Sequence, residues 1–257
     1  MLRTAEVVEA WRQAQLAEIA LRHGSSVDTA VVVPLVNDGL PCVALSYDRL
    51  ALARSLASAD EVVLAITTFA GTGPACTVRA RAATSDDPTG AAFLRLGLLE
   101  QELAKHPPSR RRIDSLLLRR EHWWLVPRVI VGFQQLNDGR QLTSADGIVA
   151  FAANRLDVAA CSILDRATEQ LRLHLPDAPP QVTAAPAVVL EHGADVPDLE
   201  RPWYRRWRGL LTGVDLTVED VEERAAADRP LRLLERWRQE RAIERACRKG
   251  LRDAGIR

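Results

Sequence analysis

Hydrophobic and polar residues follow two different periods along this chain, and the period at each point indicates a helix or a strand. Residues 4–22 contain no glycine or proline, and Trp11, Leu16 and Ile19 would lie on one side of a helix. Gly24 follows as a stop signal. We therefore expect residues 1–26 to form an N-terminal helix.

A hairpin is the clearest local signal in the next part of the chain. Apolar runs at residues 29–36 and 42–45 flank Asp38-Gly39, a pair that favours a tight turn between strands. Residues 76–82 then alternate, which places Arg79 and Arg81 on one face of a strand. The other predicted elements of this half are helices over residues 48–59, 89–105 and 110–120, and strands over 62–67, 122–126 and 128–133.

The second half of the chain is less regular in its pattern. Prolines concentrate at residues 176–186, which suggests a linker. The predicted elements are strands over residues 147–152 and 187–191, a helix over 156–173, and a charge-rich helical tail over 218–252.

Composition and charge narrow the possible classes of protein. The chain has 257 residues with 47% hydrophobic content, which is enough for a full core. The 34 basic and 34 acidic residues balance, so no global field favours nucleic acid or an anionic membrane. Apolar runs fall short of the roughly 20 residues of a membrane helix, and the N-terminus lacks a signal-peptide pattern. We expect a cytoplasmic protein without a membrane partner.

The four cysteines do not form a metal motif. They are far apart and include no CxxC pair, which argues against a zinc ribbon and against a secreted disulfide framework. The sequence therefore predicts no metal site, and it identifies neither a catalytic residue nor a substrate.

The order of these elements resembles the pyridoxamine 5'-phosphate oxidase-like split β-barrels, and within that superfamily the heme-utilisation branch. The residues that carry the resemblance are 38–46, 50–56, 102–107 and 129–133. The resemblance implies an α+β fold, with an antiparallel, Greek-key-like split β-barrel, flanking helices and a helical C-terminal extension. The implied domains are the barrel over residues 27–140, an α/β continuation over 141–200, and a basic-aromatic stretch with a helical tail over 201–257.

The resemblance also implies a function. Proteins of this kind are homodimers whose groove holds FMN, the deazaflavin F420 or heme, and some are FMN- or F420-dependent oxidoreductases. Arginine forks suit the phosphate or propionate of such a cofactor. The cofactor-binding residues that the resemblance suggests are Arg79, Arg81, Ser46, Arg49, Arg54, Thr67, His122 and Trp124. From alternation alone, Arg79 and Arg81 could equally face solvent on an open sheet.

Two aromatic clusters leave alternatives open. In the predicted strand at residues 122–126, His122 and Trp124 share a face, where they could stack on a cofactor ring or ligate heme iron, or simply pack in a core or dimer contact. Residues 201–208 combine arginines with aromatic side chains, a composition that can bind nucleic acid. Because the net charge is balanced, we expect packing rather than nucleic-acid binding there. The alternatives to a flavin-binding protein are a heme-binding or heme-degrading protein on the same fold, and a non-catalytic interaction module that uses Arg201 to Arg208.

Overall fold

The computed structural model describes residues 1–67, 75–114, 122–143, 145–167, 169–177, 182–194, 199, 202–224 and 233–256. Its helices are α1 (Thr4–Gln13), α2 (Leu50–Ser58), α3 (Ala91–Arg95), α4 (Leu98–Lys105), α5 (Pro107–Asp114) and α6 (Leu233–Asp253), with 3-10 turns η1 (Tyr47–Arg49) and η3 (His122–Leu125). Its strands are β1 (Ala17–His23), β2 (Ser26–Val32), β3 (Leu35–Asn37), β4 (Leu40–Ser46), β5 (Glu61–Ile66), β6 (Cys76–Asp87), β7 (Arg128–Gln141), β8 (Gly147–Ala152), β9 (Leu156–Arg166), β10 (Gln170–His174), β11 (Ala185–Gly193), β12 (Trp203–Thr212) and β13 (Asp215–Arg224).

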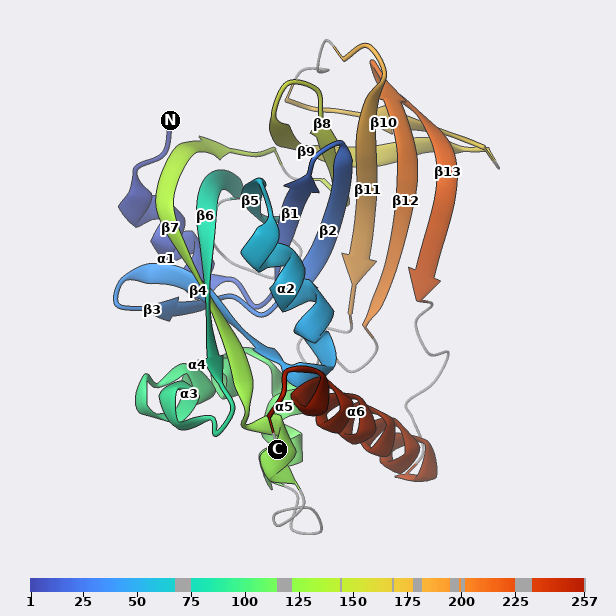
Figure 1. Cartoon of the computed structure of the whole chain (residues 1–257). Helices are drawn as coiled ribbons and strands as arrows, with labels where there is room; N and C mark the ends of the chain where they lie inside the picture. Colours follow the sequence, from blue (N-terminus) through green and yellow to red (C-terminus); the bar gives the residue numbers. More distant parts are fainter. Residues whose placement is uncertain are drawn as a thin grey trace.

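The strands form two antiparallel units that lie side by side (Figure 1). The N-terminal unit is an open seven-stranded sheet in the order β2-β1-β5-β6-β7-β4-β3, and the C-terminal unit is a closed barrel in the order β10-β13-β12-β11-β8-β9. The predicted α+β class and antiparallel pairing are therefore confirmed. The closed barrel and the C-terminal helix α6 agree with the predicted split-barrel class; the barrel is formed by strands within residues 147–224, and the strands within residues 17–141 form the seven-stranded sheet.

The sheet has its own core, into which α1 packs. Trp11 of α1 is fully buried, and its indole nitrogen donates a hydrogen bond to the Leu35 carbonyl at 2.8 Å. The ring meets Phe133 of β7 edge to face. The hairpin between β3 and β4 turns at Asp38 and Gly39, both with positive φ, as the sequence predicts.

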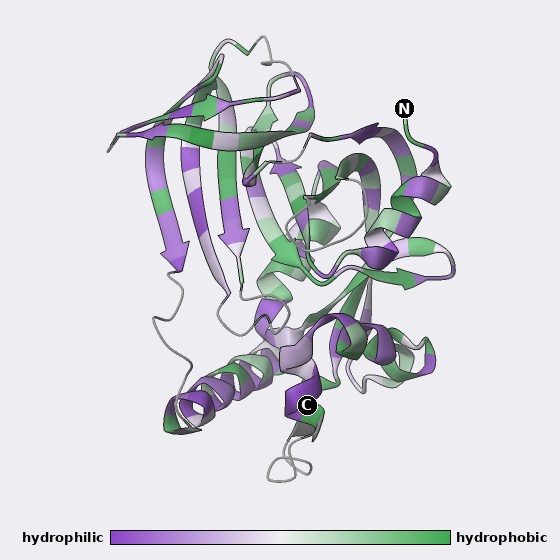
Figure 2. Ribbon diagram, turned by 180° about the vertical axis from the view of Figure 1, so that it is seen from behind, coloured by the Kyte–Doolittle hydropathy of each residue, from purple (hydrophilic) through white to green (hydrophobic). Residues whose placement is uncertain are grey.

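A continuous apolar layer joins the sheet to the barrel. Ala20 of β1 and Val63 of β5 pack in one cluster with Ile148 of β8 and with Val188 and Leu190 of β11. Along the barrel strands, hydrophilic and hydrophobic residues alternate (Figure 2), because one side faces the barrel interior and the other faces this layer or solvent. The layer therefore buries the outer face of β8 and β11 against the sheet.

Helix α6 closes the chain against the sheet unit. Cys247 is fully buried and packs with Trp124 and Leu125 of η3. Gly250 lies so close to η1 that a Cβ there would be 2.0 Å from the Tyr47 carbonyl oxygen. The N-terminal part of the helix is more open, and Trp237 is 52% exposed.

Several expected helices are strands in the structure. Residues 17–23 form β1 rather than the end of an N-terminal helix, and residues 156–173 form most of β9 and β10 rather than a helix. Most of β1 and the first half of β9 are buried on two faces, so these segments lack the alternation that identifies a strand in a sequence. The tail is a strand up to Arg224, and its helix begins at Leu233.

Two smaller differences concern local breaks. The expected helix over residues 89–105 divides into α3 and α4 at Gly97, which has a φ of 65°. The expected strand over residues 122–126 is instead a 3-10 turn that ends before Pro127. The basic helix predicted over residues 110–120 is seen as far as Asp114 in α5, and the rest lies outside the described residues.

His106, at the junction of α4 and α5, gives a pH-dependent prediction. Burial is the main cause that lowers the pKa of His106 from 6.5 to about 4, and the Glu102 carboxylate opposes the shift. Between these two values the unfolded chain binds a proton that the folded protein does not, so stability falls as the pH decreases from 6.5 to 4. We expect His106→Gln to reduce the loss in unfolding free energy between pH 7 and 4.5 by about 2 kcal/mol. Urea unfolding at both pH values measures this difference, and an unchanged pH dependence would contradict it.

Candidate functional site

The structure separates the roles of the two arginines predicted on β6. Arg79 has a side chain that is 18% exposed, and its guanidinium lies 3.4 Å from Glu61, 3.5 Å from Asp138 and 4.0 Å from Asp157. Burial is the main cause that lowers the pKa of Arg79. Arg81 is exposed, and β-bulges interrupt the β6–β7 register on both sides of Arg79. Arg79 therefore links the sheet to β9 of the barrel through carboxylates.

Three other predicted site residues lie around helix α6. The Ser46 hydroxyl donates to Asp48, which also accepts a hydrogen bond from the Cys247 thiol at 3.5 Å. Arg54 donates to the Asp253 carbonyl at 2.8 Å. Trp124 is buried against Cys247. The chain's own C-terminal helix thus contacts the surface on which the resemblance placed these residues.

The remaining predicted residues are dispersed. The Arg49 guanidinium donates to the Val31 carbonyl at 3.0 Å, and burial lowers its pKa. The His122 backbone belongs to η3, whereas its side chain lies outside the part of the chain that the structure describes. The structure therefore does not gather the predicted residues around one described pocket.

Thr67 leads to a buried polar cluster between the two units. Its hydroxyl donates to Glu18 Oε1 of β1 at 2.7 Å, and His192 Nε2 of β11 lies 2.6 Å from the same oxygen. Glu18 is 1% exposed, His192 5% and Thr67 8%. Glu18 and His192 were not singled out in the sequence, because the pair forms only when β11 packs on β1.

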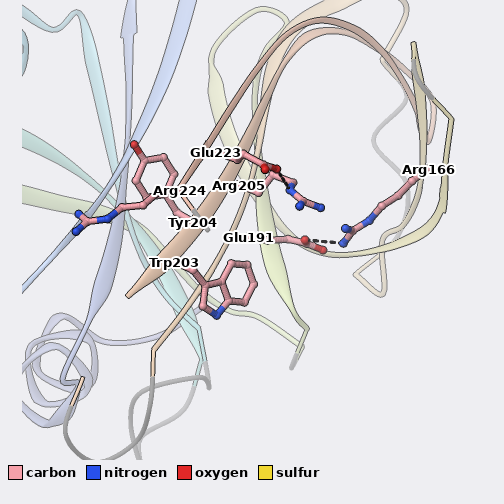
Figure 3. Close-up of a pocket in the computed structure, with 7 residues that line it drawn as sticks. All are labelled: Arg166, Glu191, Trp203, Tyr204, Arg205, Glu223 and Arg224. Atoms are coloured by element: carbon pink, nitrogen blue, oxygen red, sulfur yellow. Dashed lines mark hydrogen bonds and ion pairs between the residues drawn. The ribbon is translucent and has the colours of Figure 1, made fainter. Parts of the chain in front are cut away.

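The mouth of the barrel forms an open pocket with a volume of about 360 Å³. It lies where β9, β11 and β13 end and where β12 begins. The lining residues are Arg166, Glu191, Trp203, Tyr204, Arg205, Glu223 and Arg224. In Figure 3, Trp203, Arg205, Glu191 and Arg166 gather on the barrel side, while the side chains of Tyr204 and Arg224 extend away from them. We call the four gathered residues the mouth cluster.

Charged and aromatic groups alternate in this pocket. Arg166 bonds to Glu191 at 2.7 Å, and Arg205 bonds to Glu223 at 2.7 Å. Both guanidinium groups also lie over the ring of Trp207, with distances of 5.4 and 5.6 Å to its centroid. Trp207 is buried in the barrel core and does not line the pocket, whose aromatic lining residues are Trp203 and Tyr204. This arrangement can hold a flat, electron-rich molecule that carries negative charge.

The described arginines of the basic-aromatic stretch form ion pairs within the protein, and Arg205 also lines the mouth of the barrel. Arg205 pairs with Glu223, Arg206 with Asp28 and Glu222, and Arg208 with Asp28 and Asp220, and these contacts are given by the described residues of β2, β12 and β13. Phosphate groups of a nucleic acid would have to displace these carboxylates. Sequence reasoning had identified Trp203 and Arg205 but not Glu191 and Arg166, which come from other strands. The one available signal was Glu191, a carboxylate at the apolar phase of β11.

Neither a metal-binding cluster nor a membrane-spanning helix is found among the described residues. No group of three or more His, Cys, Asp or Glu side chains there could hold a metal ion. No helix among the same residues is long and apolar enough to cross a bilayer.

Comparisons with known proteins give similarities to solved structures only. No family model matches the sequence, and no curated protein matches it. A NimC/NimA family protein from Clostridium acetobutylicum is 9% identical and aligns 60% of this chain with 91% of its own, with a TM-score of 0.37. A Listeria innocua protein provisionally described as a pyridoxamine 5'-phosphate oxidase is 10% identical and aligns 55% of this chain with 98% of its own, with a TM-score of 0.36.

A heme binding protein from Mycobacterium smegmatis matches over a greater length. It is 14% identical, and the alignment covers 98% of this chain and 99% of that protein, with a TM-score of 0.36. Each of these structures is at most 14% identical to this chain. We transfer no residue role from them, so the assignment of a site depends on the pocket itself.

Proposed function

We propose that this protein binds a planar, anionic cofactor of the flavin class, and that the barrel mouth receives it. The observation that supports this most is the mouth cluster, in which Trp203 and two guanidinium groups surround a pocket of about 360 Å³. That volume lies within the range of roughly 300–1,000 Å³ that is usual for small-molecule sites. FMN and F420 both have a flat ring and a phosphate-bearing chain.

The residues present fit such a ring. Gly193 lies against the Trp203 indole, and a Cβ at that position would be 2.5 Å from the indole nitrogen. The glycine therefore lets Trp203 lie on the β11 backbone at the edge of the pocket, where its face can stack on a flat ligand. The lining side chains Arg166 and Arg205 supply cations beside it.

An anionic group of the ligand can reach Arg205 at little cost. The pair between Arg205 and Glu223 has side chains that are 37% and 51% exposed. Ion pairs with this exposure contribute about 0–1 kcal/mol. A phosphate can therefore replace Glu223 on Arg205, and it would gain a charge-assisted hydrogen bond in exchange.

The proposal also covers the activity, the oligomeric state and the cellular location of the protein. A bound flavin supplies hydride or electron transfer, which would make the protein an oxidoreductase. The chain's own part would be to bind and orient the ring at the mouth and to hold its anionic chain. We further propose a homodimer in the cytoplasm, where the free thiols of the four cysteines would stay reduced.

The contribution of Trp203 to cofactor binding tests this proposed function. We expect the purified protein to bind FMN or F420, and Trp203→Ala to weaken the affinity by about tenfold or more, because ring stacking of this kind is worth about 1–3 kcal/mol. Absorbance and fluorescence titration measures both. Trp237→Ala, which removes an exposed tryptophan of α6, is the matched control.

A second control tests the arginines first suggested by the sequence. Arg81→Ala on β6 should leave the affinity unchanged if the mouth is the site. A loss with Arg81→Ala, but not with Trp203→Ala, would move the cofactor to the sheet. A Soret band after mixing with heme, without binding of either flavin, would replace the flavin class by heme.

A further inference from the structure

Glu191 has an unusual position in the barrel mouth. Its side chain is only 9% exposed, yet it lines the pocket. One carboxylate oxygen, Oε2, accepts a hydrogen bond from Arg166 at 2.7 Å. Within the described residues, no hydrogen bond reaches the other oxygen. Glu191 Oε1 is not among the fully buried side-chain atoms without a partner, so this largely buried carboxylate presents an open acceptor to the pocket.

The position of this acceptor is fixed by the neighbouring strand. Gly147 of β8 faces Glu191, and a Cβ at Gly147 would be 3.2 Å from Glu191 Cγ and 2.5 Å from the Leu190 carbonyl oxygen. On its other side the carboxylate is held by Arg166. The absence of a side chain at residue 147 therefore leaves room for Glu191 beside β8, and the bond to Arg166 holds the carboxylate at the pocket.

An open acceptor in such a place calls for a donor from the ligand. A hydrogen bond to a charged acceptor is stronger than one between neutral groups, and a ligand that covered this oxygen without offering a donor would leave it unsatisfied at a cost. An ionised carboxylate can only accept, whereas the guanidinium of Arg166 beside it can only donate. Together they offer an acceptor next to a donor. The complementary ligand edge has an N–H next to a carbonyl, as in a lactam or imide ring.

We propose that Glu191 is a specificity-determining residue of the mouth, which accepts the imide N–H of a flavin ring while Arg166 donates to an adjacent ring carbonyl. This inference rests on the proposed function. The flavin and deazaflavin rings both carry an N3–H between two carbonyl groups. Heme has no such edge, because its ring nitrogens all bind iron. The same pair of residues would therefore favour flavins over heme.

A ligand that lacks the N–H tests this inference without changing the protein. We expect wild-type protein to bind FMN about tenfold or more tightly than N3-methyl-FMN, because a hydrogen bond to a buried charged acceptor is lost. Isothermal titration measures both affinities. Equal affinity for the two ligands would overturn the role of Glu191 while leaving the proposed function in place. Failure of FMN and F420 to bind at all would overturn both.

Substitutions in the mouth show which residue causes the preference for FMN over N3-methyl-FMN. Glu191→Leu should remove the preference for FMN over N3-methyl-FMN, mainly by weakening FMN, whereas Glu223→Leu, the matched change at the exposed carboxylate of the same mouth, should keep the preference. If Glu191→Leu weakened both ligands equally, Glu191 would act on the pocket's shape and not on the N–H, and the inference would be wrong. Thermal unfolding shows whether each variant is folded, and the wild-type comparison of the two ligands decides the matter if Glu191→Leu is not.

Discussion

His192→Ala is expected to reduce the free energy of unfolding by about 2–4 kcal/mol, because it removes a hydrogen-bond partner from the buried Glu18 side chain and leaves a cavity. His192 Nε2 lies 2.6 Å from Glu18 Oε1, and both side chains are almost fully buried between β1 and β11. Without the imidazole, Glu18 keeps only the Thr67 hydroxyl on that oxygen. Equilibrium denaturation in urea measures the loss.

The matched control for this change is an exposed histidine. His174→Ala on β10 should alter stability by no more than about 0.5 kcal/mol, as surface substitutions usually do. Combining His192→Ala with Glu18→Leu should recover part of the loss, because no uncompensated carboxylate then remains. If His192→Ala were no worse than His174→Ala, the buried pair would not hold the barrel on the sheet.

Gly250→Val is expected to displace helix α6. A Cβ at residue 250 would lie 2.0 Å from the Tyr47 carbonyl oxygen and 2.8 Å from its carbon, and backbone atoms cannot turn aside as a side chain can. Overpacking of this kind costs about 1–3 kcal/mol, and more where the backbone itself must move. The helix would then leave its place on η1 and η3.

Thiol chemistry can detect this displacement. Cys247 is a fully buried residue of α6, and the cysteines Cys42, Cys76 and Cys161 are also buried. The folded wild-type protein should therefore react slowly with an aromatic disulfide reagent, whereas Gly250→Val should gain one fast-reacting thiol, which peptide mass spectrometry would assign to Cys247. Lys249→Val, at the exposed neighbouring position, should react like the wild type. An unreactive Cys247 in Gly250→Val would show that α6 tolerates the change.

Local chemistry explains what the sequence could predict of the fold. The turn at Asp38 and Gly39 depends on two residues that accept positive φ, so the hairpin is visible in the sequence. Likewise, the alternation in residues 76–82 identifies β6 correctly. By contrast, most of β1 and the first half of β9 are buried on both faces, so they lack the apolar–polar alternation that distinguishes a strand from a helix.

The features that the sequence could not predict depend on contacts between residues far apart in the chain. The charged residues of β13 look like a solvated helix in the sequence, but Glu222 and Glu223 pair with arginines of β12 across the barrel wall. The mouth cluster combines Arg166, Glu191 and Trp203 from three strands, and no spacing in the sequence relates them. Arg79 was correctly placed on its strand, yet its carboxylate partners come from residues up to 157, so its pairing was invisible.

Two adjacent residues of strand β11 face opposite sides of the strand and make different contacts. Glu191 faces the interior of the mouth, and His192 faces the sheet. Adding or deleting one residue within Ala185–Gly193 would rotate every later side chain to the opposite side. The imidazole would then enter the ligand pocket, the carboxylate would enter the apolar layer, and both sites would fail together. Differences in length between natural versions of this protein should therefore fall outside β11, even where substitutions within it are accepted.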